Sequence, residues 1–194
     1  MNKEEVSKRV LKDGKPLPID KFTWDEDTNT FSSIEDNLVL DFNEINSCTF
    51  NVGAYCTFNT AYNCTFKTAY NCTFNTGSKC TFDTGSDCTF KTEDTCTFNT
   101  RSKCTFDTLS DCTFKTGSDC TFDTGSSCTF DTGQKCVVVR RKCAGTAWLI
   151  DVYEVIELDE EKVIKLNGHE AKGYTVIEGC EKCRECHQVL KEKK

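Results

Sequence analysis

Several kinds of residue and segment that would indicate familiar functions are scarce or absent in this 194-residue sequence. No apolar run reaches ten residues, which excludes a transmembrane helix and leaves no apolar core for a secretory signal peptide. We therefore expect no membrane association. With no export signal, we expect a cytoplasmic protein, the cytoplasm of the host cell if the chain is encoded by a phage.

Residue patterns for catalysis are equally scarce. The chain has only two histidines, no glycine-rich loop of the kind that holds phosphate, and no nucleophile elbow. No pair of carboxylates stands apart from the surface charge. The sequence therefore predicts a protein that is not an enzyme.

A positively charged stripe is also missing. The net charge is −7, and the 24 lysines and arginines are interspersed with 31 acidic residues. Because nonspecific binding to nucleic acid depends on clustered basic residues that meet phosphates, direct nucleic-acid binding is disfavoured.

What the sequence does contain is a repeat of eight residues that reads Cys-Thr-Phe-x-Thr-x-x-x. Cysteines recur at every eighth position from Cys48 to Cys136, and a phenylalanine follows two residues after each of the first eleven. A short unit at a fixed period cannot bury its own apolar side and must stack on its copies. The sequence therefore predicts an all-β fold, a parallel β-solenoid of octapeptide repeats.

Alternation within the unit predicts which side chains form the core. In an extended strand, Cys and Phe point to one side, and the first Thr and the variable residue point to the other. Stacked cysteines come close enough for disulfides, but a buried thiol also serves as a small apolar side chain, and we favour unoxidised thiols. The predicted core ladder includes Cys64, Phe66, Cys88, Phe90, Cys112 and Phe114.

Two alternatives are open for the number of repeats in one coil. Residues 72–95 and 96–119 match at 19 of 24 positions, which favours three repeats per coil. Three corner residues span about 13 Å at most, whereas two sheets stack about 10 Å apart, so a full reversal is tight. We therefore predict a three-sided coil over a two-sided roll of 16 residues per turn.

The ends of the chain predict caps for the solenoid. Asn2 can cap a short helix, and residues 22–31 form a hairpin-like segment. Near the other end, Asn167-Gly168 indicates a turn between two strands. The predicted parts are an N-terminal cap (1–31), the solenoid (32–140), a small β cap that is a candidate for homodimer formation (141–179), and a cysteine-rich basic tail (180–194).

Two short motifs are candidate sites. Cys180, Cys183, Cys186 and His187 have the spacing and chemistry of a structural zinc site, while spare thiols, an iron–sulfur cluster and haem attachment are the alternatives. The run Arg140, Arg141 and Lys142 follows the last repeat and could contact an anionic partner, although such runs are usually solvated. No other cofactor is indicated.

The repeat also resembles a known group of proteins. The tandem Cys-Thr-Phe-x-Thr-Gly-x-x is preceded by the segments starting at Val10 and Phe22, which read Val-Leu-Lys-Asp-Gly-Lys-Pro-Leu and Phe-Thr-Trp-Asp. It is followed by Cys136-Val-Val-Val-Arg-Arg. Together these segments resemble phage-encoded solenoid proteins that are loosely described as pentapeptide-repeat-like. Several true pentapeptide-repeat proteins imitate nucleic acid and inhibit enzymes that handle DNA.

These observations lead to three hypotheses about function. The first is a non-catalytic phage solenoid that binds, and inhibits, a host macromolecule such as a nucleic-acid-handling or defence enzyme, with a protein as its partner. The second is a stiff structural rod of the virion, in its tail or spike. The third is a zinc-dependent regulator that acts through the cysteine cluster at Cys180.

Overall fold

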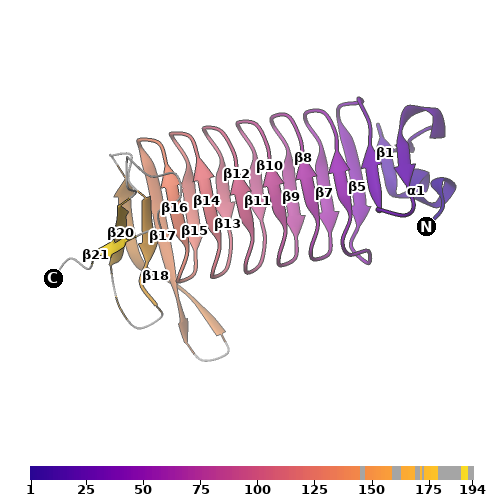
Figure 1. Cartoon of the computed structure of the whole chain (residues 1–194). Helices are drawn as coiled ribbons and strands as arrows, with labels where there is room; N and C mark the ends of the chain where they lie inside the picture. Colours follow the sequence, from indigo (N-terminus) through magenta and orange to yellow (C-terminus); the bar gives the residue numbers. More distant parts are fainter. Residues whose placement is uncertain (145–146, 159–162, 169–170, 172, 179–188, 192–194) are drawn as a thin grey trace.

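The computed structural model of the chain describes residues 1–144, 147–158, 163–168, 171, 173–178 and 189–191. The chain forms a β-solenoid of about seven turns, as the repeat predicts. Two long sheets lie face to face along its length, and the chain passes from one to the other at every repeat (Figure 1).

The strands of the solenoid alternate between the two sheets, named sheet A and sheet B. Sheet A contains β5 (Leu38–Phe42), β7 (Thr57–Thr60), β9 (Thr73–Thr76), β11 (Thr89–Lys91), β13 (Thr105–Asp107), β15 (Thr121–Thr124) and β17 (Cys136–Ala144). Sheet B contains β4 (Thr30–Ser32), β6 (Thr49–Asn51), β8 (Thr65–Lys67), β10 (Thr81–Asp83), β12 (Thr97–Asn99), β14 (Thr113–Thr116) and β16 (Thr129–Thr132).

The prediction of three repeats per coil is wrong. Phe82 pairs with Phe66 on one side and Phe98 on the other, so one turn takes 16 residues and two repeats. The reversal at each corner is possible because the sheets are close: Phe82 and Phe90, from opposite sheets, meet edge to face with ring centroids 5.2 Å apart. Interlocked rings thus bring the sheets within reach of a three-residue corner.

A left-handed residue makes each corner. The residue directly before every repeat cysteine has a positive φ, as at Lys79 (φ 60°) and Thr95 (φ 63°). This conformation turns the chain sharply and aims the N–H of Lys79 at the carbonyl of Asp94 in the next coil, at 3.0 Å. The glycines at the first position of the corners, such as Gly85, do not adopt a positive φ.

The core consists of the predicted cysteines and phenylalanines. Cys64, Phe66, Cys88, Phe90, Cys112 and Phe114 are all at most 1% exposed. Within one sheet the rings stack nearly parallel, as between Phe74 and Phe90, whose centroids are 4.8 Å apart at an angle of 3°. Such ladders bury large apolar areas and align ring edges with ring faces between the sheets.

The N-terminal cap begins with a short helix. It comprises α1 (Lys3–Arg9), β1 (Val10–Lys12), β2 (Lys15–Pro16), a 3₁₀ turn (Ile19–Lys21) and β3 (Thr23–Asp25). Asn2 and Glu5 form a reciprocal capping box, which confirms the predicted helix start. β3 pairs antiparallel with β4 as the expected hairpin, and β2, at the end of sheet A, carries Pro16, which cannot donate to another strand.

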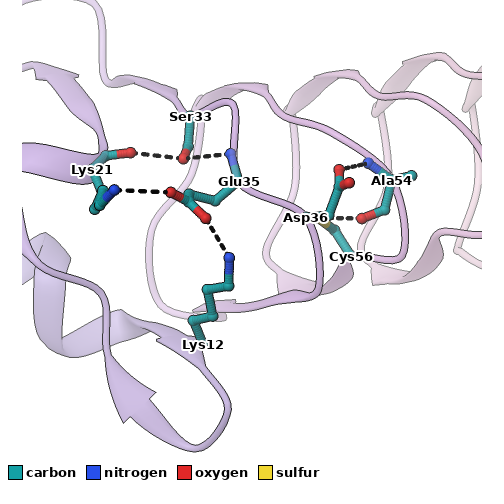
Figure 2. A network of polar contacts seen from close by, with 7 residues as sticks. All are labelled: Lys12, Lys21, Ser33, Glu35, Asp36, Ala54 and Cys56. Atoms are coloured by element: carbon teal, nitrogen blue, oxygen red, sulfur yellow. Dashed lines mark hydrogen bonds and ion pairs between the residues drawn. The ribbon is translucent and has the colours of Figure 1, made fainter.

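Polar contacts join the cap to the first coil (Figure 2). Glu35 forms ion pairs with Lys12 and Lys21, and these contacts lower the pKa of the Glu35 carboxyl, chiefly through the Lys12 ammonium group. Beside it, Asp36 accepts a hydrogen bond from the N–H of Ala54 at 2.7 Å. The cap and the first complete coil are thereby held in one arrangement.

Extending the eight-residue period back from Phe50 predicts that Phe42 and Ile34 occupy phenylalanine positions, but the first coil departs from this register. Phe31, not Ile34, lies at the phenylalanine position, because it pairs with Phe50. Leu40 likewise pairs with Phe58, two residues from the expected alignment. Ile34 is 95% exposed, so the eight-residue period does not extend into this coil.

Antiparallel strands close the other end of the solenoid. They are β18 (Ala147–Leu158), β19 (Val163–Leu166), β20 (Tyr174–Glu178) and β21 (Val189–Lys191). β18 pairs with β17 at the end of sheet A, and β19 pairs with β16 at the end of sheet B. β19 and β20 pair across the segment that contains Asn167, which confirms the predicted hairpin.

Candidate functional site

The two flat faces of the solenoid carry regular columns of polar side chains. On each face, a threonine column runs beside the column of variable residues. The order in sheet B is Ser32, Asn51, Lys67, Asp83, Asn99, Lys115 and Asp131. Every lysine in both faces lies between an asparagine and an aspartate, so charges are compensated locally and neither face presents a patch of one sign.

The corners differ from the faces because they carry aromatic residues. The turns from sheet B to sheet A form corner row 1, and those from sheet A to sheet B form corner row 2, on opposite sides of the rod (Figure 1). Tyr55 and Tyr70 in row 1 and Tyr62 in row 2 are 50%, 48% and 53% exposed. Tyr55 and Tyr70 meet edge to face with centroids 5.4 Å apart. Large aromatic side chains held in the open are typical of protein-binding surfaces.

A groove lies next to Tyr70 in corner row 1. Its volume is about 700 Å³, and it is open to the surface. Its principal side chains are Lys67, Tyr70, Asp83, Asp87 and Arg101, with Gly85 between Tyr70 and Arg101. The groove therefore combines an aromatic ring, two cations and two carboxylates from three adjacent coils.

Gly85 creates this groove because its place in the corner cannot hold a side chain. Its N–H donates to the carbonyl of Ala69 at 2.6 Å. A Cβ added at Gly85 would lie 2.6 Å from the Ala69 carbonyl oxygen, well inside van der Waals contact. The first position of this corner thus has no side chain, while Tyr70 and Arg101 extend from the corners of the two adjacent coils.

A related groove lies in corner row 2, and each of its main residues is one repeat earlier. It has a volume of about 360 Å³ and includes Tyr62, Gly77 and Glu93. A Cβ at Gly77 would lie 3.3 Å from the carbonyl carbon of Ala61, which is also crowded. The charged wall differs in sign, because Glu93 takes the place of Arg101. Glu93 also accepts a hydrogen bond from Ser78 Oγ at 2.9 Å.

The thiols of the predicted core ladder are held in a uniform environment. In most repeats, the cysteine Sγ donates a hydrogen bond to the carbonyl two residues earlier, as Cys80 does to Ser78 at 3.6 Å. The hydrogen bond with Cys112, together with burial, raises the pKa of Cys96 to about 11. The hydrogen bond with Cys128 and burial raise the pKa of Cys112 to about 12. Cys96 and Cys112 therefore stay protonated at neutral pH and are poor nucleophiles.

The structure buries Arg140 within the chain, whereas the sequence predicted a solvated residue or a contact for an anionic partner. It is 1% exposed, and its guanidinium donates to the carbonyls of Asn167 (3.1 Å) and Ala171 (2.9 Å). Arg141 lies on the surface but forms ion pairs with Asp107 and Asp123 at 3.1 and 2.5 Å. Arg141 relieves the repulsion between these two stacked carboxylates. The side chain of Lys142 lies outside the described part.

The predicted zinc ligands Cys180, Cys183, Cys186 and His187 lie outside the described residues. Within the residues that the structure describes, no group of three or more histidine, cysteine or acidic side chains is arranged to hold a metal ion. In that same part of the chain, no helix has the length and apolar character needed to cross a membrane.

Comparison of the chain with protein-family models, with curated proteins and with solved structures finds no match. The function is therefore inferred from the geometry of the grooves and of the core.

Sequence analysis missed the grooves, although the sequence contains a signal for them. Ala69, Gly85 and Arg101 are 16 residues apart, and Tyr70 follows Ala69, so these residues become neighbours only when two repeats make a coil. With three repeats per coil, these residues would lie on different sides of the rod.

Proposed function

We propose that this chain is a non-catalytic binding protein that engages a protein partner through the grooves beside Tyr70 and Tyr62. The observation that carries the proposal is that tyrosines half-exposed to solvent flank side-chain gaps at Gly85 and Gly77. Tyrosine and arginine are the residues that most often dominate the binding energy of protein interfaces.

The chemistry of the grooves favours a protein over other macromolecules. The groove at Gly85 mixes Lys67 and Arg101 with Asp83 and Asp87, so its charges suit a polypeptide with side chains of both signs. A nucleic acid would instead require a surface of one sign to meet its phosphates. The two grooves have opposite charged walls, which gives the two corner rows different preferences.

The solenoid supplies the rigidity that such a surface needs. The tyrosines stand on corners whose backbones are hydrogen-bonded to the neighbouring coils, as Tyr55 N–H is to the Tyr70 carbonyl at 3.0 Å. A preordered surface loses little conformational entropy when a partner binds. If the chain is encoded by a phage, as its resemblance implies, the partner is a host protein whose activity the solenoid blocks.

To test this proposal, the tagged chain and matched variants are used to capture a partner protein from a bacterial lysate. Tyr70→Ser and Tyr62→Ser are compared with Tyr174→Ser, which changes a tyrosine of similar exposure (44%) outside both grooves. We expect a stoichiometric protein that is lost with Tyr70→Ser or Tyr62→Ser and retained with Tyr174→Ser. Equal capture by all variants would show that the grooves are not the binding site, and recovery of the chain in purified virions would favour a structural rod.

A further inference from the structure

The core contains two straight columns of thiols that the proposed binding function does not use. One column belongs to each sheet, with six buried, free cysteines in each. The columns are Cys48, Cys64, Cys80, Cys96, Cys112 and Cys128, and Cys56, Cys72, Cys88, Cys104, Cys120 and Cys136.

The spacing of sulfurs along a column follows from the coils. Core phenylalanines one coil apart have centroids 4.8 Å apart, as for Phe82 with Phe98 and Phe90 with Phe106. The cysteines share one orientation, because Cys80 and Cys96 each approach the carbonyls 2 and 19 residues earlier at 3.6–3.7 Å. Their sulfurs therefore repeat at the same interval as the rings.

This interval is too long for a disulfide and suits a bridging ion. A disulfide bond measures about 2.05 Å, so oxidation would require neighbouring sulfurs to approach by more than half their separation. Two metal–sulfur bonds of about 2.3 Å, placed in line, span about 4.6 Å. An ion can therefore lie between two stacked sulfurs at nearly their existing separation.

We propose that each thiol column binds soft d¹⁰ cations that coordinate two thiolates in line, one ion between two cysteines of adjacent coils. For a divalent ion such as Hg(II), the reaction is 2 RSH + Hg²⁺ → Hg(SR)₂ + 2 H⁺. Each thiol loses its proton to solvent, two Hg–S bonds form, and the product is neutral. A neutral product suits a core of phenylalanine rings, where a charged one would be costly.

The site distinguishes between metal ions by their coordination geometry as well as by their softness. Thiolates prefer soft ions, whereas structural zinc requires four ligands in a tetrahedron. A column offers only two sulfurs to an ion at the midpoint, so Zn²⁺ is excluded. The N–H of Cys64 already points to Sγ of Cys80 at 3.4 Å, and that of Cys104 to Sγ of Cys120 at 3.5 Å. These amides stabilise negative charge on sulfur.

Stoichiometry and the number of coordinated sulfurs test the proposal. The full chain, with Cys143, Cys180, Cys183 and Cys186 replaced by serine, is reduced and incubated with Hg²⁺ in the presence of excess Zn²⁺. With six thiols in each column, we expect three ions per column and six per chain. X-ray absorption should show two sulfurs around each mercury, no bound zinc, and an unchanged β-sheet circular dichroism spectrum. Twelve mercury ions with one sulfur each, loss of the β-sheet spectrum on binding, or no binding would overturn the proposal.

Two matched variants test whether neighbouring thiols are required. Cys64→Ala, Cys96→Ala and Cys128→Ala together leave three thiols of one column with none in adjacent coils. Cys96→Ala, Cys112→Ala and Cys128→Ala leave three thiols in consecutive coils, which form one pair. We expect three and four mercury ions per chain, respectively. Equal numbers in the two variants would contradict pairing, and if either variant does not fold, the sulfur count in the chain with the intact columns decides.

Discussion

Arg140 occupies the position that Thr124 holds one coil earlier, and its guanidinium closes the column of inward threonines at the end of the solenoid. The preceding members of this column, such as Thr108 and Thr124, are small and buried. The last coil has no further repeat to cover it, so a long side chain reaches to the carbonyls of Asn167 and Ala171 beyond. Arg140 therefore attaches the C-terminal strands to the solenoid.

Replacing Arg140 with alanine should destabilise the C-terminal cap. The change removes two hydrogen bonds from a buried charged donor to the carbonyls of Asn167 and Ala171, which costs about 2–4 kcal/mol. Arg141→Ala is the matched control, because its ion pairs lie on the surface and should contribute at most about 1 kcal/mol. Urea unfolding followed by circular dichroism measures both changes, and equal losses for the two arginines would show that burial of Arg140 is not decisive.

Thr95 is the corner residue with the least suitable side chain for its backbone. It has a φ of 63°, and a β-branched side chain is disfavoured in this left-handed region. Its side chain is exposed, so its replacement sacrifices no core packing. Thr95→Asn should therefore stabilise the fold by about 1 kcal/mol, because asparagine tolerates this conformation.

Asp111 provides the control for Thr95, since it occupies the same corner position one coil later with a φ of 60°. Asp111→Asn exchanges two residues that both tolerate the left-handed region, and the midpoint of thermal unfolding should hardly move. A similar stabilisation by both changes would assign the effect to removal of charge or to asparagine itself, not to backbone strain.

The sequence predicted the β-solenoid because the repeat itself specifies which residues form strands and which face the core. The alternation of Cys, Thr and Phe within a unit determines which side chains face inward, whatever the number of units per coil. Asn2 and Glu5 lie three residues apart in one short motif, so the start of the helix could also be predicted. These features depend on residues that are near one another in the chain.

The shape of the coil depends on contacts between residues 16 or 24 positions apart, and the sequence contains conflicting signals about which of these contacts form. The similarity of residues 72–95 to 96–119 favoured three repeats, but that register would stack Lys67, Lys91 and Lys115 together. In the structure each lysine lies beside an aspartate, as Lys67 lies beside Asp83. Charge compensation therefore indicated the correct number of repeats per coil. The positions of the grooves depend on that number. The burial of Arg140 depends on strands beyond the repeat and had no local signal.

Gly85 should be intolerant of a side chain, although alanine and arginine occupy the same corner position in the adjacent coils. A Cβ there would lie 2.6 Å from the Ala69 carbonyl oxygen, and the backbone must move to relieve the clash. Gly85→Ala should cost about 1–3 kcal/mol, typical of overpacking. Gly168→Ala is the control, because a Cβ at Gly168 meets no atom within 4 Å. Chemical unfolding of the two variants separates the effects, and a neutral Gly85→Ala would mean that the groove can be filled freely.

Stability should fall as the pH rises above the range in which free thiols titrate. A cysteine in the unfolded chain has a pKa of about 8.5, whereas that of Cys96 is about 11 and that of Cys112 is about 12 in the folded protein. The unfolded state thus releases protons first, and alkaline pH favours unfolding. The contribution of each thiol is fully present below about pH 8.5 and decreases by about 1.4 kcal/mol per pH unit until its folded pKa is reached.

Urea unfolding of the reduced chain between pH 8 and 10.5 measures this dependence. The double variant Cys96→Ala and Cys112→Ala removes two of the titrating thiols, so its free energy of unfolding should fall less steeply with pH by up to about 2.7 kcal/mol per unit. Lysines and tyrosines titrate equally in both proteins and cancel in the comparison. Parallel curves for the two proteins would mean that these buried thiols have the same pKa in the folded and unfolded states, in conflict with their hydrogen bonds and burial in the core.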